Sequence, residues 1–119
     1  MNEMIRILIV EPHQPPREAQ IPNTLEAQKA VVQGYVEYCY DDGCFIVVNE
    51  EGKLNGMEGN RRIPGDVLVG PFFIAGDGGD DLCSLTDQEV EKYSARFAQP
   101  EEISQEEIDG HMGMTFHVF

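Results

Sequence analysis

The feature that most constrains the fold is a run of seven residues near the start of the chain, Met4 to Val10, with the sequence MIRILIV. Every position except Arg6 is apolar, and several of the side chains are β-branched. Such a run is typical of a strand covered on both faces, whereas a half-exposed strand alternates apolar and polar side chains. We therefore predict a central strand in a sheet with cover on both sides.

Two further β-prone regions follow. Residues 35–40 and 44–48 are rich in aromatic and β-branched side chains, and Asp41-Asp42-Gly43 between them suits a tight turn, so we predict a hairpin. Residues 66–75 are also strongly apolar, but Gly70-Pro71 interrupts them, and proline cannot donate a hydrogen bond to a neighbouring strand. This region is expected to form two strand segments with a bend, or an edge strand.

The first helix signal lies between residues 24 and 33. Asn23 followed by Glu26 resembles an N-cap with its reciprocal partner, and Gly34 is suited to end the helix in the left-handed conformation. Three prolines at positions 12, 15 and 16 argue against regular structure directly after the first strand.

A second helix is predicted from about Thr86, which forms a capping-box pattern with Glu89. Its apolar stripe has the three- and four-residue spacing of a helix and consists of Val90, Tyr93 and Phe97. The signal is weaker beyond this point. Residues 100–110 suit one or two helical turns, and residues 114–119 suit a final strand.

Together these elements predict an α+β fold. We expect a mixed or mainly antiparallel sheet with two main helices packed on it, in the order β-α-β-β-β-α, followed by a weak C-terminal α-β extension. A chain of 119 residues that is 41% hydrophobic has the size and the apolar content for one modest core. Residues 1–98 are expected to form a compact domain, and residues 99–119 an acidic extension within that same domain.

Several site types have no support in the pattern. The cysteines Cys39, Cys44 and Cys83 and the three histidines lack zinc-site spacing, and residues 76–81 lack the ligand order of an EF-hand loop. No nucleophile elbow or phosphate-binding loop is present. We predict no metal, no cofactor and no enzymatic activity, and we interpret the cysteines as reduced core residues. No apolar run approaches the roughly 18 residues that span a bilayer and no export signal is recognisable, so a cytoplasmic protein is expected.

Charge gives the main functional signal. The formal net charge is −14 at pH 7, and residues 77–109 carry −9 of it, with eleven acidic and two basic side chains. A field of this sign repels phosphates, so direct binding to nucleic acid is not expected, nor binding to a membrane, and a host protein with a basic surface is the favoured partner. A solvated acidic face that promotes solubility is the simpler interpretation. The candidate partner-binding residues are Asp77, Asp80, Asp81, Asp87, Glu91, Glu101, Glu102, Glu106, Glu107 and Asp109.

A second candidate site lies in residues 49–62, a glycine-rich segment that holds three of the eight basic residues. Arginine side chains recognise phosphate or carboxylate through two parallel hydrogen bonds, and glycines allow a ligand to approach the backbone closely. The alternative is a connection whose arginines pair with glutamates of the same chain. The candidate residues for a phosphorylated or nucleotide-like ligand are Lys53, Asn55, Asn60, Arg61 and Arg62.

Several short motifs occur together and in order. They are IRILIVEP from residue 5, IPNTLE from 21, GYVE from 34, NEEGKLNG from 49, NRR from 60, GDVLVGPFFI from 65 and SLTD from 84. In this combination the chain resembles a family catalogued as a domain of unknown function (DUF3846), over roughly residues 4–98. The resemblance implies an accessory protein of Gram-positive bacteria, their phages or mobile elements. It supplies no catalytic residues.

The leading hypothesis is a non-enzymatic phage or mobile-element protein that binds and inhibits a basic, nucleic-acid-handling host defence protein, of the anti-CRISPR or anti-restriction type. Carboxylates of residues 77–109 would form one surface and occupy a groove lined by Lys and Arg. Charge reversal at Glu101, Glu102, Glu106 and Glu107 is then expected to slow association more than dissociation. The alternative is a small-molecule-binding domain that uses the Asn60-Arg61-Arg62 loop. The oligomeric state is left open.

Overall fold

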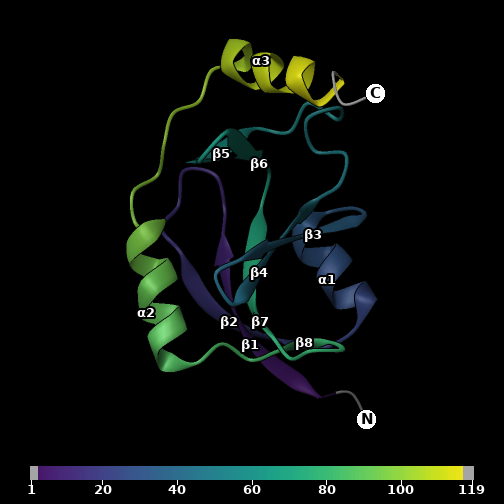
Figure 1. Ribbon diagram of the computed structural model, residues 1–119, viewed down its shortest axis with the longest axis vertical. Coiled ribbons are helices and arrows are strands. Elements are labelled where there is room, and N and C mark those ends of the chain that lie inside the picture. The colour runs from purple at the N-terminus through teal and green to yellow at the C-terminus, as the bar shows by residue number, and fades with distance from the viewer. Residues whose placement is uncertain (1–2, 117–119) are drawn as a thin grey trace.

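The protein folds around a main antiparallel sheet with helices on both faces, as seen in a computed structural model (Figure 1). The structure describes the backbone of residues 3–116 and the side chains of residues 3–111. The strands are β1 (Met4–Val10), β2 (Arg17–Pro22), β3 (Val36–Asp41), β4 (Cys44–Asn49), β5 (Gly59–Ile63), β6 (Asp66–Val69), β7 (Phe72–Asp77) and β8 (Leu82–Cys83). The helices are α1 (Leu25–Val32), α2 (Asp87–Arg96) and α3 (Gln105–Phe116). The predicted α+β class is confirmed.

The main sheet has the strand order β2-β1-β7-β4-β3, and the short β8 also pairs with β7. All neighbours are antiparallel. Strands β5 and β6 form a separate hairpin, which stands apart from the main sheet at one end of the molecule, and α3 lies over it (Figure 1).

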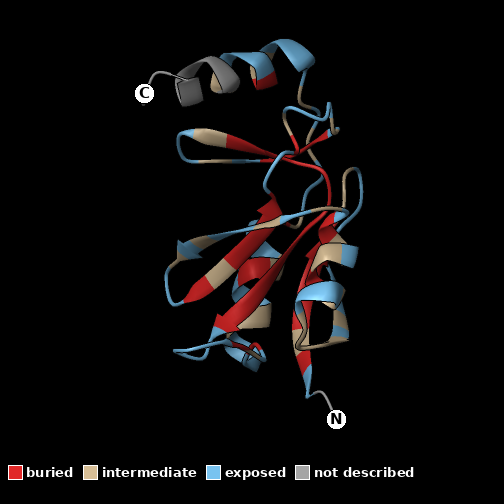
Figure 2. Cartoon of the chain, turned by 90° about the vertical axis from the view of Figure 1, so that its right-hand side faces the viewer, coloured by how far each residue is buried: buried red, intermediate tan, exposed pale blue. Residues whose placement is uncertain are grey.

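Strand β1 explains the layered core. Its side chains alternate between two apolar clusters: Ile5, Ile7 and Ile9 lie on the α1 face, and Leu8 and Val10 lie on the α2 face. Both sets are buried, because each face has its own helix (Figure 2). The predicted central strand is therefore confirmed, and its unbroken apolar run follows from burial on two sides.

The predicted hairpin is confirmed as β3 and β4, and the apolar region after residue 65 forms the two strands β6 and β7 with a bend at Gly70-Pro71. Gly70 has φ 69°, and a Cβ there would lie 2.7 Å from the sulfur of Met57, so this bend requires glycine. The edge-strand alternative was wrong for β7, which lies between β1 and β4.

Both main helices begin near the predicted positions. Thr86 and Glu89 form the expected capping box of α2. For α1 the cap is Thr24 and not Asn23, because the Thr24 side chain accepts a hydrogen bond from the backbone of Ala27. The left-handed residue at the end of α1 is Gln33, one position before the predicted glycine.

Three strands, β2, β5 and β8, were not predicted. Strand β2 has the sequence REAQIP and none of its residues is fully buried, so it lacks the apolar pattern of a core strand. The predicted C-terminal strand was wrong where it can be compared: residues 114–116 belong to α3, and residues 117–119 lie outside the described part of the chain.

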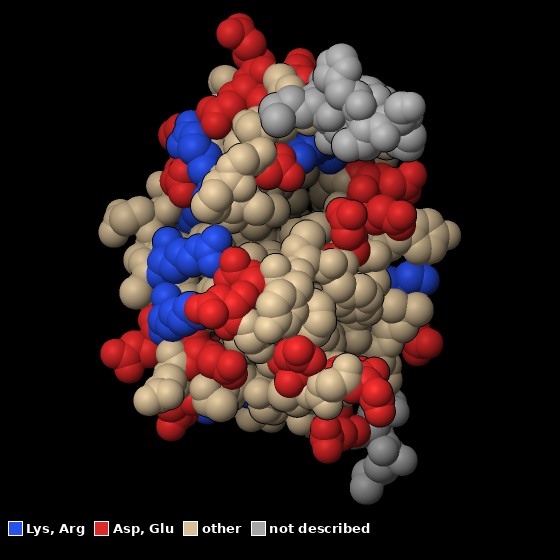
Figure 3. All heavy atoms as spheres, in the orientation of Figure 1, with Lys and Arg blue, Asp and Glu red and all other residues tan. Residues whose placement is uncertain are grey.

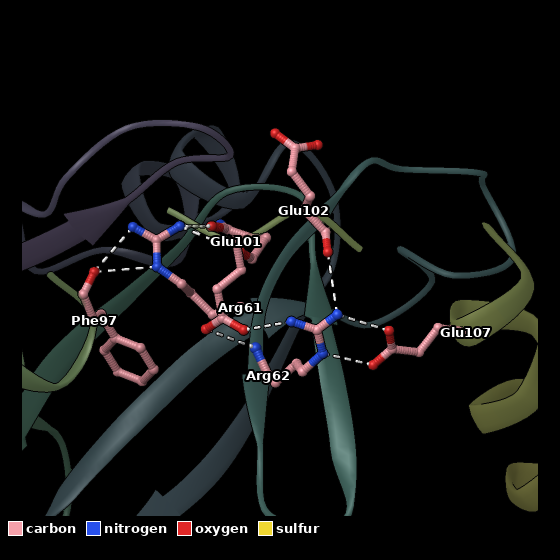
Figure 4. A network of polar contacts seen from close by, with 7 residues as sticks. Arg61, Arg62, Phe97, Glu101, Glu102 and Glu107 are labelled. Atoms are coloured by element: carbon pink, nitrogen blue, oxygen red, sulfur yellow. Dashed lines mark hydrogen bonds and ion pairs between the residues drawn. The ribbon is translucent and has the colours of Figure 1, made fainter. Parts of the chain in front are cut away.

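A fully buried arginine joins these elements. Arg61 on β5 is 0% exposed, and all five of its N–H groups donate hydrogen bonds. Nε and Nη2 donate to the Phe97 carbonyl at 3.1 and 2.9 Å (Figure 4). Nη2 also donates to the Gln14 carbonyl at 2.6 Å. Nη1 donates to the backbone and side-chain oxygens of Asn60, whose own amide donates to the Val10 carbonyl at 2.9 Å.

The position of Arg61 is favourable for a cation, because Phe97 is the C-cap of α2 and the C-terminus of a helix carries partial negative charge. Burial nevertheless lowers the pKa of Arg61 from its usual value.

Replacing Arg61 with methionine should destabilise the protein by about 3 kcal/mol or more, because the buried carbonyls that it satisfies would lose their donors. Arg61→Lys should recover little, since an ammonium group cannot reproduce the planar fork. Urea unfolding measures both, with Arg17→Ala at an exposed site as a control that changes little. A midpoint for Arg61→Met equal to that of the control would contradict this role.

Candidate functional site

The ten acidic residues expected to form one surface are divided between distant parts of the molecule. Asp77, Asp80 and Asp81 lie at the β7–β8 turn, and residues 101–109 lie in α3 and the segment before it. Figure 1 shows β8 and α3 at opposite ends of the longest axis, with α2 between them. The prediction that these carboxylates form one continuous surface is therefore wrong, because α2 carries the chain from one end of the sheet to the other.

The acids nearest the C-terminus mostly have cationic partners within the chain. Arg62 on β5 contacts Glu101 at 2.9 Å and Glu107 at 2.8 Å, and it also donates to the backbone carbonyl of Glu102 (Figure 4). The Glu102 side chain lies 3.4 Å from His13. These contacts attach α3 and the segment before it to β5 and to the β1–β2 loop.

These contacts shift the pKa values of the side chains that make them. The hydrogen bond from Arg62 lowers the pKa of Glu107 below its usual 4.5 and, together with the bond to Glu101, raises the pKa of Arg62. The hydrogen bond to Glu58 raises the pKa of His13 above its usual 6.5. All three shifts favour the charged form of the group concerned.

The other candidates on α2 and α3 differ from one another. Asp87 contacts Arg6 at 2.8 Å, and Asp109 accepts a hydrogen bond from Gln105. Glu91 and Glu106 are exposed and have no ion-pair partner among the described side chains. In Figure 3, Lys and Arg gather mainly along the side where α2 lies, next to Asp and Glu, so this side is largely neutralised.

The three aspartates of the β7–β8 turn are different. Asp77, Asp80 and Asp81 are exposed, and within the described part of the chain none has an ion pair with Lys, Arg or His. Asp77 accepts from the Gly79 backbone at 2.9 Å, and Asp81 accepts from the Leu82 backbone at 2.8 Å and from the Asn23 amide at 3.1 Å. The carboxylates of Asp77 and Asp81 are thus held in place by neutral donors.

Exposed aromatic side chains lie next to this turn. Tyr38 and Tyr40 on β3 are 45% and 65% exposed, and both rings pack edgewise on Phe45 of β4, with centroids 6.4 and 5.5 Å apart. Phe45 pairs with Ala75 of β7, and Asp77 is two residues further along the same face. Burial raises the pKa of Tyr38, and the negative charge of Asp81 raises it further.

We call this surface the aromatic–acidic face: Tyr38, Tyr40, Phe45, Asp77, Asp80 and Asp81. Sequence reasoning found its aspartates but not its aromatic residues, which we had treated only as strand formers. Their spacing of two along β3 was the available signal, because alternate residues of an edge strand share a face.

The glycine-rich basic segment does not assemble as the expected ligand site. Asn60 and Arg61 are 0% exposed and their donors are used inside the protein. Arg62 pairs with Glu101 and Glu107, which agrees with the interpretation of arginines neutralised by glutamates of the same chain. Lys53 instead contacts Asp66 at 2.6 Å, and Asn55 is exposed in a turn.

Burial favours the protonated form of the three thiols. Cys44 is 0% exposed and its Sγ donates to Glu89 at 3.3 Å, and burial raises its pKa to about 11. Burial also raises the pKa of Cys39 and of Cys83. Within residues 3–111 no group of three or more His, Cys, Asp or Glu side chains is arranged to hold a metal ion. Among the described helices, none has the length and apolar character needed to cross a membrane.

Comparison with protein-family models matches residues 5–98 with the family described as a domain of unknown function (DUF3846). No curated protein and no solved structure matches the chain. The match ends shortly after α2, so α3 and its contacts with Arg62 lie beyond it.

Replacing Arg62 with glutamine should loosen α3 without unfolding the sheet, because Ile108 remains packed against β6. Lowering the pH should act in the same direction. A carboxyl group with a lowered pKa stabilises fully above 4.5, its usual value, and loses this contribution as the pH falls through the lowered value.

Hydrogen exchange of residues 103–111 measures both effects. Protection, taken relative to the intrinsic exchange rate at each pH, should fall in Arg62→Gln and in the wild type at acid pH, while protection in β1 changes less. Arg17→Gln, which removes an exposed pair elsewhere, is the control. Unchanged exchange in α3 would show that the apolar contacts alone hold it.

Proposed function

The chain belongs to the DUF3846 family, whose description assigns no activity, and we propose that this member is a non-enzymatic binding protein for a partner with a basic surface. One observation carries the proposal: three exposed aspartates without a cationic partner, among the described residues, adjoin exposed aromatic rings on the aromatic–acidic face.

The aspartates are suited to guide a basic partner. Negative charges repel each other over distances up to about a Debye length, which is about 8 Å at physiological ionic strength. A cationic surface removes the repulsion between these aspartates. Charges at the rim of an interface act mainly on the rate of association and on its dependence on salt. By contrast, Glu101 and Glu107 already have a cation in contact, so their charge is largely satisfied before any partner arrives.

The aromatic side chains are suited to supply lasting affinity. Tyrosine is enriched among the residues that dominate binding energy at interfaces, because it buries a large surface while losing little conformational freedom. Tyr38 and Tyr40 also present ring faces or edges to solvent beside negative charge, an environment that attracts Arg and Lys side chains.

The class of partner follows from the same chemistry. A protein that handles nucleic acid lines its groove with Lys and Arg to contact phosphates, and a carboxylate surface competes for that groove. We propose that the partner is a host defence nuclease or a related protein, and that the chain acts as an anti-CRISPR or anti-restriction accessory factor of a phage or mobile element. The small-molecule alternative at residues 60–62 is not proposed, because Asn60 and Arg61 have no donor left for a ligand.

The test is competition with DNA. Purified restriction endonucleases and CRISPR effector nucleases, each bound to a fluorescent DNA duplex, are titrated with the protein, and DNA release is followed by anisotropy. We expect release from at least one of them, weakening as salt rises from about 50 to about 200 mM. No release from any nuclease in the panel would contradict the proposed partner class.

Two variants with equal charge locate the surface. Replacing Asp77, Asp80 and Asp81 with asparagine keeps the oxygens that accept backbone hydrogen bonds and should slow association by roughly tenfold. The matched control replaces Glu91 and Glu106 with glutamine and Asp109 with asparagine, and it should change the rate much less. Tyr40→Ala should accelerate dissociation. Equal slowing by both triple variants would show that only total charge matters.

A further inference from the structure

A cleft separates the main sheet from the β5–β6 hairpin, on the face of the sheet opposite α1. Its volume is about 440 Å³, within the range of small-molecule sites. Figure 3 shows the surface hollowed below α3. The apolar part of its wall comes from both sheets and includes Val48 of β4 together with Leu68 and Val69 of β6, all of which are buried.

The cleft has an excess of negative charge. Glu37 and Glu50 line it and are exposed, with no ion-pair partner among the described side chains. Asp66 also lines it and contacts Lys53 at 2.6 Å, so the one ammonium group of the lining is already neutralised. An anionic ligand would meet two uncompensated carboxylates, whereas a cation would be attracted by them.

The register of the β3–β4 hairpin places carboxylates next to apolar side chains in the wall of the cleft. Glu37 pairs with Val48 across β3 and β4, and Cys39 is two residues from Glu37 on the same face. Glu50 is likewise two residues from Val48. The carboxylates therefore lie beside an apolar wall, an arrangement that fits a molecule with one charged end and one apolar end.

We propose that this cleft binds a small organic cation, with an alkylammonium or guanidinium group near Glu37 and Glu50 and an apolar body against Val48, Leu68 and Val69. This proposal is independent of the aromatic–acidic face, which lies on the opposite side of the sheet. The lining also contains a chemical reporter, because Cys39 is partly exposed in the cleft. Burial raises its pKa, so alkylation proceeds through the minor thiolate fraction that alkaline pH supplies.

The test uses three six-carbon probes whose head groups are cationic, neutral and anionic: hexylamine, hexan-1-ol and hexanoate. Alkylation of Cys39 by iodoacetamide is followed in a Cys83→Ser variant, in which the remaining Cys44 is fully buried. The reaction is run at about pH 8.5, where an alkylammonium group with a pKa near that of lysine, roughly 10.4, remains charged.

Hexylamine should slow alkylation in a saturable way, hexan-1-ol should act more weakly, and hexanoate should have no effect. A blocked Gly-Lys-Gly peptide distinguishes two sources of the same group: protection equal to that by hexylamine assigns the site to a lysine of a partner protein, and weaker protection assigns it to a free amine. Protection by hexanoate as strong as by hexylamine, or no protection by either amine, would overturn the proposal.

Variants test the role of the carboxylates. Glu37→Gln and Glu50→Gln should each raise the dissociation constant of hexylamine by up to about fivefold, as for a partly exposed ion pair. Glu91→Gln on α2 removes the same charge at a position outside the cleft and should leave the dissociation constant of hexylamine unchanged. Lys53→Met should strengthen amine binding, because it frees the carboxylate of Asp66. Equal weakening by Glu91→Gln, or weaker binding in Lys53→Met, would contradict the proposed geometry.

Discussion

The structure depends on the buried guanidinium of Arg61. It satisfies carbonyl groups from the C-terminus of α2 and the β1–β2 loop and, through Asn60, it is connected to the last residue of β1. These segments are far apart in sequence and are not paired strands, so no sheet ladder joins them. A side chain with five fixed donors can satisfy several such carbonyls at once, which an apolar residue cannot do. The β5–β6 hairpin, although outside the main sheet, is thereby attached to it.

The few basic residues of this acidic chain are mostly engaged with its own groups. Arg62 holds α3, Arg6 contacts Asp87, and Lys53 contacts Asp66. What matters for recognition is therefore the set of carboxylates left without a cation, and not the net charge of a sequence segment. Among these, the carboxylates that adjoin exposed aromatic rings or an apolar wall lie on the β7–β8 turn and at the edge of the cleft. The two proposed sites are on opposite faces of the sheet, so they can be tested independently.

Sequence patterns predicted the elements whose apolar residues contact the core directly, such as β1, the β3–β4 hairpin and α2. They did not predict β2 and β5, because an exposed edge strand and a strand built around a buried arginine have no apolar alternation. The candidate sites were predicted in part. Local charge identified Asp77, Asp80 and Asp81, but whether a carboxylate has a cationic neighbour depends on tertiary contacts between distant residues. The burial of Arg61 likewise could not be predicted from the sequence, since arginine is rarely found in a core.

The position of β1 has a consequence for how the chain folds. Its partner on one side is β2, which follows closely in sequence, but its partner on the other side is β7, with Leu8 opposite Ile74. The middle of the sheet therefore closes only after most of the polypeptide has been synthesised. Until then β1 has one unpaired edge beside strongly apolar side chains, and pairings of such long sequence separation form slowly. We expect the nascent protein to be most prone to aggregation during this interval, while its acidic side chains keep neighbouring molecules apart.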